Sequence, residues 1–68
     1  MIIAGESVLV DTTTHAIRQK ENQILADSMS GRSYLLAAYG TEAEARSIFA
    51  AIRHDLEQGR PYVGIRTI

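Results

Sequence analysis

The chain has 68 residues, no cysteine, and a formal net charge of −1 from seven Lys and Arg and eight Asp and Glu residues. This length predicts a single domain over residues 1–68, and the lack of cysteine excludes a disulfide framework and a cysteine zinc site. No apolar run approaches the roughly 20 residues that span a membrane, and no signal peptide is visible. We therefore expect a folded cytoplasmic protein that does not associate with membranes.

A domain this small has a marginal core. By area scaling, the free energy gained from apolar burial roughly equals the conformational entropy lost on ordering the chain. Because disulfides are excluded, association with another chain is the commonest remaining way to bury more surface. The composition thus favours a homo-oligomer, most simply a dimer.

The N-terminal part of the chain predicts short strands. Ile2-Ile3 and Ser7 to Val10 are β-prone runs separated by Gly5. Asp11 followed by the triplet 12–14 is typical of a turn that leads into a new strand.

Residues 15–20 and 23–27 predict a hairpin that turns at Glu21-Asn22. Pairing across this turn places apolar residues of the two strands on one shared face. The predicted register pairs Lys20 with Gln23, Gln19 with Ile24 and Ile17 with Ala26, while Arg18 and Leu25 share the other face.

Residues 32–39 predict the strongest strand, which is apolar on both faces. Simple alternation directs Tyr34, Leu36 and Ala38 to one side of it and its remaining apolar residues to the other. A helix can cover only one of these faces, so the second must meet either a curled part of the sheet or another subunit. The candidate interface residues on this second face are Leu35, Ala37 and Tyr39.

The clearest element is a helix over residues 42–58. Thr41 and Glu44 form a capping-box pair at its start, and Gly59 with Pro61 ends it. Apolar residues at steps of three and four give it one hydrophobic stripe, made of Ala45, Ile48, Phe49, Ile52 and Leu56.

Residues 62–68 predict a short strand that adds either to its own sheet edge or to a neighbouring chain. Tyr62, Val63 and Ile65 are further candidate interface residues. Taken together, the elements predict an α+β domain, with a small antiparallel sheet of about four or five short strands and one long helix packed on one face.

No residue pattern predicts an enzyme. His15 and His54 are the only histidines, and neither has partners at metal-ligand spacing. The glycines are dispersed, and the hydroxyl residues form no nucleophile motif. We expect no catalytic, cofactor-binding or metal-binding residues.

Basic residues suggest one alternative function. Arg46, Arg53 and Arg60 recur every seven residues, but Glu42 lies four residues before Arg46 and Glu57 four after Arg53, a spacing that predicts ion pairs on a solvated helix face. A second group could present arginine and tyrosine on a sheet that binds single-stranded nucleic acid by stacking. The basic residues of that group are Arg18, Lys20, Arg32 and Arg66.

The run from Gly31 to Ala45 resembles a segment of small phage and prophage proteins, in which a Tyr-Leu-Leu strand leads into a capped helix. This resemblance implies a small sheet-plus-helix protein from a mobile element and assigns no active-site residue. The prediction is a small non-enzymatic accessory or protein-interaction module, of bacterial or mobile-element origin, that self-associates, with another protein as a second candidate partner. The alternative is a nucleic-acid-binding regulator.

Overall fold

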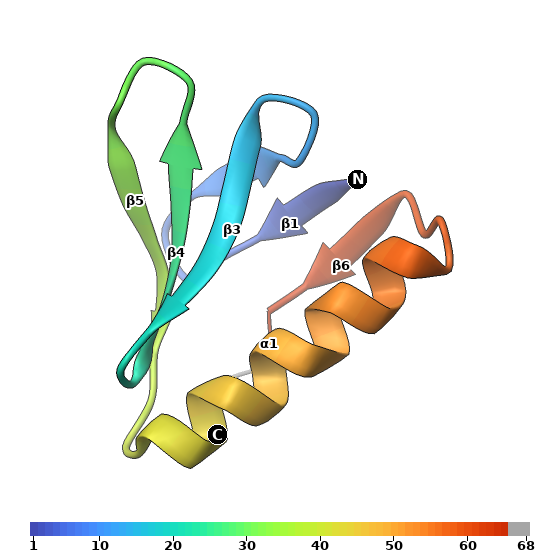
Figure 1. The fold of residues 1–68 in the computed structure, drawn as a ribbon. Coiled ribbons are helices and arrows are strands. Elements are labelled where there is room, and N and C mark those ends of the chain that lie inside the picture. The colour runs from blue at the N-terminus through green and yellow to red at the C-terminus, as the bar shows by residue number, and fades with distance from the viewer. Residues whose placement is uncertain (66–68) are drawn as a thin grey trace.

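The computed structural model describes residues 1–65 and has an α+β fold with a single helix packed against small sheets (Figure 1). Two three-stranded sheets are present, with strand orders β2-β1-β6 and β3-β4-β5. The elements are β1 (Ile2–Ala4), β2 (Leu9–Asp11), β3 (His15–Lys20), β4 (Gln23–Ser28), β5 (Ser33–Ala38), α1 (Glu42–Glu57) and β6 (Tyr62–Gly64).

The β3–β4 hairpin has the predicted register. Lys20 lies opposite Gln23, Ile17 opposite Ala26, and Arg18 opposite Leu25. Glu21 in the turn has a φ of 53°, a left-handed conformation that a tight hairpin turn requires and that a non-glycine residue adopts at some cost. Local pairing across a short turn is sufficient to set this register.

Strand β5 departs from simple alternation. Its pairing with β4 shifts between Ile24 and Leu25, which lie opposite Ala37 and Leu35, so that Leu36 is an extra residue in a β-bulge. The prediction that Leu35, Ala37 and Tyr39 share one face is therefore wrong. Ala37 and Tyr39 lie in the core, whereas Leu35 is 44% exposed on the opposite side.

The β2-β1-β6 sheet joins the two ends of the described chain. Ile3 on the central strand pairs antiparallel with Val10 and parallel with Val63. The expectation of one antiparallel sheet is thus corrected to two sheets, one of them mixed. A parallel pair between strands so far apart in sequence leaves no local signal, because no short turn connects them.

Helix α1 begins and ends close to the predicted positions. The side chain of Thr41 accepts a hydrogen bond from the Glu44 backbone N–H at 3.2 Å, and Gln58 is the C-cap. Gly59 has a φ of 72°, which suits the residue after a helix C-terminus. The helix packs its small and β-branched side chains against the sheets. Its buried residues are Ala45, Ile48 and Ile52.

The core lies between the helix and both sheets. Its largest fully buried side chains come from three different strands: Ile3, Ile24 and Leu36. Partly buried side chains from every layer surround them, including Ile17 on β3 and Phe49 on α1. Part of the core is therefore covered only by side chains, such as Ile17 and Phe49, that are themselves partly exposed to solvent.

Candidate functional site: a groove beside the edge of β3

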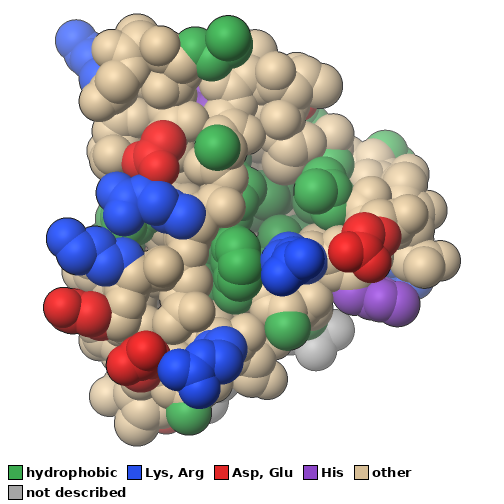
Figure 2. All heavy atoms as spheres, viewed as in Figure 1, with side chains coloured by type: hydrophobic (Ala, Val, Ile, Leu, Met, Phe, Trp, Pro, Cys, Tyr) green, Lys and Arg blue, Asp and Glu red, His purple; other side chains and the backbone are tan. Residues whose placement is uncertain are grey.

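A half-open groove of about 420 Å³ lies between β3 and α1. Figure 2 shows hydrophobic side chains at the bottom of a hollow between the β3-β4-β5 strands and the helix. In this view the strands stand on one side and α1 on the other, as in Figure 1. The residues that line the groove are Met1, Ile3, Thr12, His15, Ala16, Ile17, Phe49, Ile52, Arg53 and Leu56.

The groove is apolar at its base and on both walls. Ile3 is fully buried, and Ile52 is 5% exposed. Ile17 on the strand and Phe49 on the helix are partly buried against the core. Leu56 extends the helix wall and is 48% exposed, although it belongs to the helix's apolar stripe. The stripe is thus longer than the surface that the sheets cover.

The strand wall of the groove is a sheet edge. In a two-residue hairpin the closing pair, here Lys20 and Gln23, exchanges both backbone hydrogen bonds, and such bonded pairs then recur at every second residue. Arg18 and Ala16 therefore bond to β4, whereas the N–H and C=O groups of Ile17 and Gln19 point away from it. Within residues 1–65 no further strand pairs with this edge of β3.

The side chains of β3 alternate between the inner and the outer face of the sheet. His15, Ile17 and Gln19 are partly buried on the face that α1 covers, and the residues between them are exposed on the outer face. Ile17 lies opposite the fully buried Ala26, which identifies the inner face. A strand added to this edge would therefore direct alternate side chains toward the groove.

Two polar side chains lie at the groove rim. The Nδ1 atom of His15 is 2.9 Å from the Thr14 hydroxyl and 3.2 Å from the Asp11 carbonyl oxygen, and its ring stands 5.8 Å from that of Tyr34. Arg53 on the helix forms no ion pair with any residue of the described part of the chain.

The predicted ion pairs along the helix form in part. Arg46 contacts Glu42 at 3.1 Å, as predicted. Arg60 instead contacts Asp55 at 3.1 Å, and the predicted pair between Arg53 and Glu57 is absent from residues 1–65. The guanidinium beside the groove is therefore left available to solvent or to a partner.

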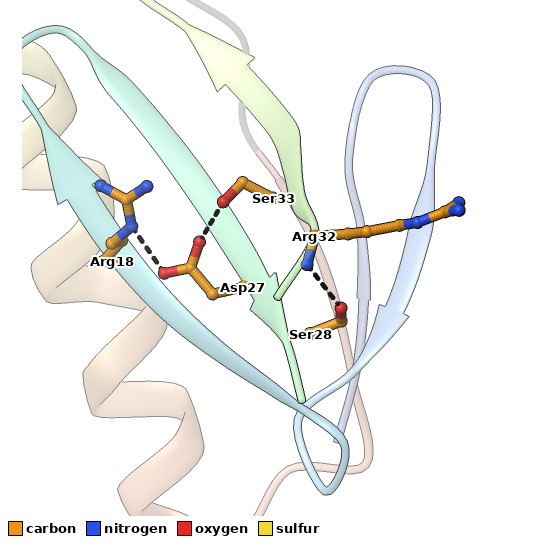
Figure 3. A network of polar contacts seen from close by, with 5 residues as sticks. All are labelled: Arg18, Asp27, Ser28, Arg32 and Ser33. Carbon is orange, nitrogen blue, oxygen red and sulfur yellow. Dashed lines mark hydrogen bonds and ion pairs between the residues drawn. The ribbon is translucent and has the colours of Figure 1, made fainter. Parts of the chain in front are cut away.

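The outer face of the β3-β4-β5 sheet carries a polar network that links its three strands (Figure 3). The Asp27 carboxylate on β4 accepts hydrogen bonds from Arg18 Nε and from the Ser33 hydroxyl, each at 2.6 Å. These bonds lower the pKa of Asp27, with the Ser33 hydroxyl as the larger cause and Arg18 as the second. Arg18 is thus occupied within its own chain.

The basic residues proposed for nucleic acid do not form one surface with the tyrosines. Arg18 lies on the outer face, whereas Tyr34 pairs with the buried Ala26 on the inner face. The Arg32 side chain extends away from the Asp27 network (Figure 3). Lys20 is exposed at the end of β3, and Arg66 lies outside the described residues.

The C-terminal interface candidates divide between surface and core. Tyr62 on β6 is 59% exposed, while Val63 and Ile65 pack against the core from partly buried positions. The strand therefore adds to its own sheet edge, which was one of the two predicted possibilities.

Sequence reasoning missed the groove itself, and with it Ile17 and Leu56 as surface residues. A signal was present, because Leu56 continues the apolar stripe of the helix past Ile52, its last buried residue. The unpaired edge of β3 had no such signal, since strand order is not encoded locally.

Comparison of the chain with protein-family models, with curated proteins and with solved structures found no match. Within residues 1–65, no group of His, Asp and Glu side chains is arranged to hold a metal ion. No helix in that part of the chain is long and apolar enough to cross a membrane.

Proposed function

We propose that the protein is a small interaction module that binds an extended segment of another chain as an added strand on β3. The observation that carries this proposal is the coincidence of an unpaired strand edge with an apolar groove along the same strand. In strand addition, backbone hydrogen bonds supply affinity and side-chain pockets beside the edge supply specificity. Both requirements are present at β3.

The shape of the groove supports a strand rather than a compact ligand. It is half-open to solvent, and its lining is mostly apolar, with His15 and Arg53 at the rim. Small-molecule sites bury most of their ligand and converge several polar groups on it. An added strand needs only space for alternate side chains, which the groove between Ile17 and Leu56 provides.

The edge itself also supports the proposal. An exposed sheet edge is a template for pairing, and proteins that do not use it protect it with proline, bulges, charged side chains along the edge or inward-pointing charges. Strand β3 contains none of these on its inner face, where Ile17 is flanked by His15 and Gln19. The two charged side chains of the strand, Arg18 and Lys20, lie on the outer face, and Arg18 is held there by its 2.6 Å contact with Asp27.

The test is titration of the isotope-labelled full chain with a capped peptide of alternating Val and Thr, followed by backbone and methyl NMR. We expect shifts at the amides of Ile17 and Gln19 and at the methyl groups of Leu56. The matched control is the same peptide with N-methyl groups on two adjacent central residues, which removes central backbone donors from both of its edges and should abolish binding. Shifts confined to other surfaces, or equal binding of the N-methylated peptide, would overturn the proposal.

A further inference from the structure

We infer that the added strand is β3 of a second copy of this chain, paired antiparallel about a two-fold axis with Ile17 opposite Ile17 of the second copy. This inference rests on the proposed function and names the partner at the same site. The direction of the backbone groups, the charges on the outer face and the exposed side chains of the groove all favour this pairing.

Backbone direction limits the possible registers. Only His15, Ile17 and Gln19 direct their N–H and C=O groups away from β4, so bonded pairs between two copies must join these residues. A symmetric pair centred on Ile17 joins His15 to Gln19 at both ends and uses all of the outward groups of β3. A pair centred on Ala16 or Arg18 leaves one of these residues beyond the paired region.

Charge on the outer face favours the same register. With Ile17 at the centre, Arg18 of each copy lies opposite Ala16 of the other, so the long side chain has a small neighbour. Centring the pair on Arg18 would instead place like charges directly opposite each other, which is destabilising. In the favoured register each Arg18 keeps its 2.6 Å contact with Asp27 of its own chain.

The two-fold symmetry of this pairing brings the apolar groove of one copy next to the apolar groove of the other. Antiparallel pairing within one sheet has its two-fold axis perpendicular to the sheet, so both copies of α1 lie on the same face. The grooves of the two copies meet over the paired β3 strands. The partly buried Phe49 and the 48% exposed Leu56 line that region of each copy and would cover the other copy's groove. The marginal core of so small a chain gains burial in this way.

The absence of cysteine makes disulfide trapping a clean test of the register. In the inferred dimer, residues 16 and 18 of opposite copies form a non-hydrogen-bonded pair about 4.5 Å apart at Cα, within the range of a disulfide. An oxidised mixture of the full-length Ala16→Cys and Arg18→Cys chains should therefore cross-link several times more than either variant alone. Both positions are exposed, so neither substitution disturbs the core.

Other cross-linking results would overturn the register. Strongest self-cross-linking of Arg18→Cys would place the centre at residue 18, and strongest self-cross-linking of Ala16→Cys would place it at residue 16. A Leu9→Cys variant serves as a collision control, because Leu9 is 67% exposed and belongs to the other sheet. Cross-linking of this control as strong as that of the mixture would also overturn the inference.

Sedimentation velocity of the unmodified chain separates this inference from the proposed function. A dimer that dissociates on Ile17→Pro but not on Tyr62→Ser supports the inference. A strict monomer that still binds the Val and Thr peptide at β3 overturns the inference and leaves the proposed function intact. A strict monomer that binds no peptide overturns both.

Discussion

The two edges of the β3-β4-β5 sheet differ in their backbone hydrogen bonding: the β5 edge is bonded to another part of the chain, whereas the β3 edge has no further strand neighbour in residues 1–65. At the β5 edge, the Leu36 carbonyl oxygen accepts a hydrogen bond from the Glu6 N–H at 2.9 Å, and the bulge turns Leu36 into the core. At the β3 edge, Ile17 and Gln19 have no such partner in residues 1–65, and a groove lies alongside. One chain thus closes one edge with its own N-terminal turn and leaves the other unpaired within residues 1–65.

The closed edge depends on a close approach of backbone to backbone. A Cβ atom at Gly5 would lie 2.9 Å from the Leu36 carbonyl oxygen and 3.0 Å from its Cα. Only glycine allows the turn between β1 and β2 to approach this near. The open edge has no comparable constraint, so substitutions there should affect association more than folding.

The largest expected effect comes from removing the side chain at the bulge. Leu36→Ala should lower the free energy of unfolding by about 2–5 kcal/mol, because it leaves a cavity at a fully buried position. The matched control is Leu35→Ala, one residue earlier and 44% exposed, which should change it by less than about 0.5 kcal/mol. Urea denaturation of both variants measures the difference, and equal losses would contradict the observed bulge.

The next effect concerns the close approach itself. Gly5→Ala should destabilise the protein by about 1–3 kcal/mol, because the backbone of Leu36 must move to admit the methyl group. Gly64→Ala on β6 is the control, since a Cβ atom there has no neighbour within 4 Å. Thermal unfolding should separate the two variants clearly. A Gly5→Ala protein as stable as Gly64→Ala would show that the β5 edge is not closed in this way.

Proline substitutions on β3 test which backbone N–H groups bond to β4 and which point away from it. Arg18→Pro should cost about 1–3 kcal/mol more than Arg18→Ala, because it removes a hydrogen bond to β4 and leaves a carbonyl unpaired. At Ile17 the difference between proline and alanine should be smaller, since its N–H points away from the sheet. Denaturation of the four variants measures both differences. A larger proline penalty at Ile17 would reverse the assigned backbone direction.

The smallest effect is a dependence on pH at the outer face. Hydrogen bonds from Ser33 and Arg18 hold the pKa of Asp27 below its ordinary value of 3.8, so its contribution to stability is complete above that value. The contribution is lost as pH falls through 3.8 toward the lower pKa of the folded state. Between about pH 5 and pH 3 the native chain should therefore lose more stability than Asp27→Asn. Parallel slopes for the two proteins would contradict this.

Much of the fold could be predicted from local sequence. The capping box at Thr41 and the stop at Gly59 defined the helix, and the hairpin register from Lys20 to Gln23 was confirmed residue by residue. These features depend on contacts within a few residues, where side-chain type and backbone preference act together. The candidate site was not predicted, because it arises from an edge and a helix that meet only after folding.

The sequence by itself determined one helix, one hairpin and strands that begin and end near the observed residues, since each rests on periodicity, caps or turn chemistry. Only the tertiary structure decided that β1 pairs with both β2 and β6 and that the bulge buries Leu36 and Ala37 together. It also decided that β3 is the edge with a groove. Strand order and bulges follow from how distant segments pack around a shared core, and that information is not present in any local stretch of the chain.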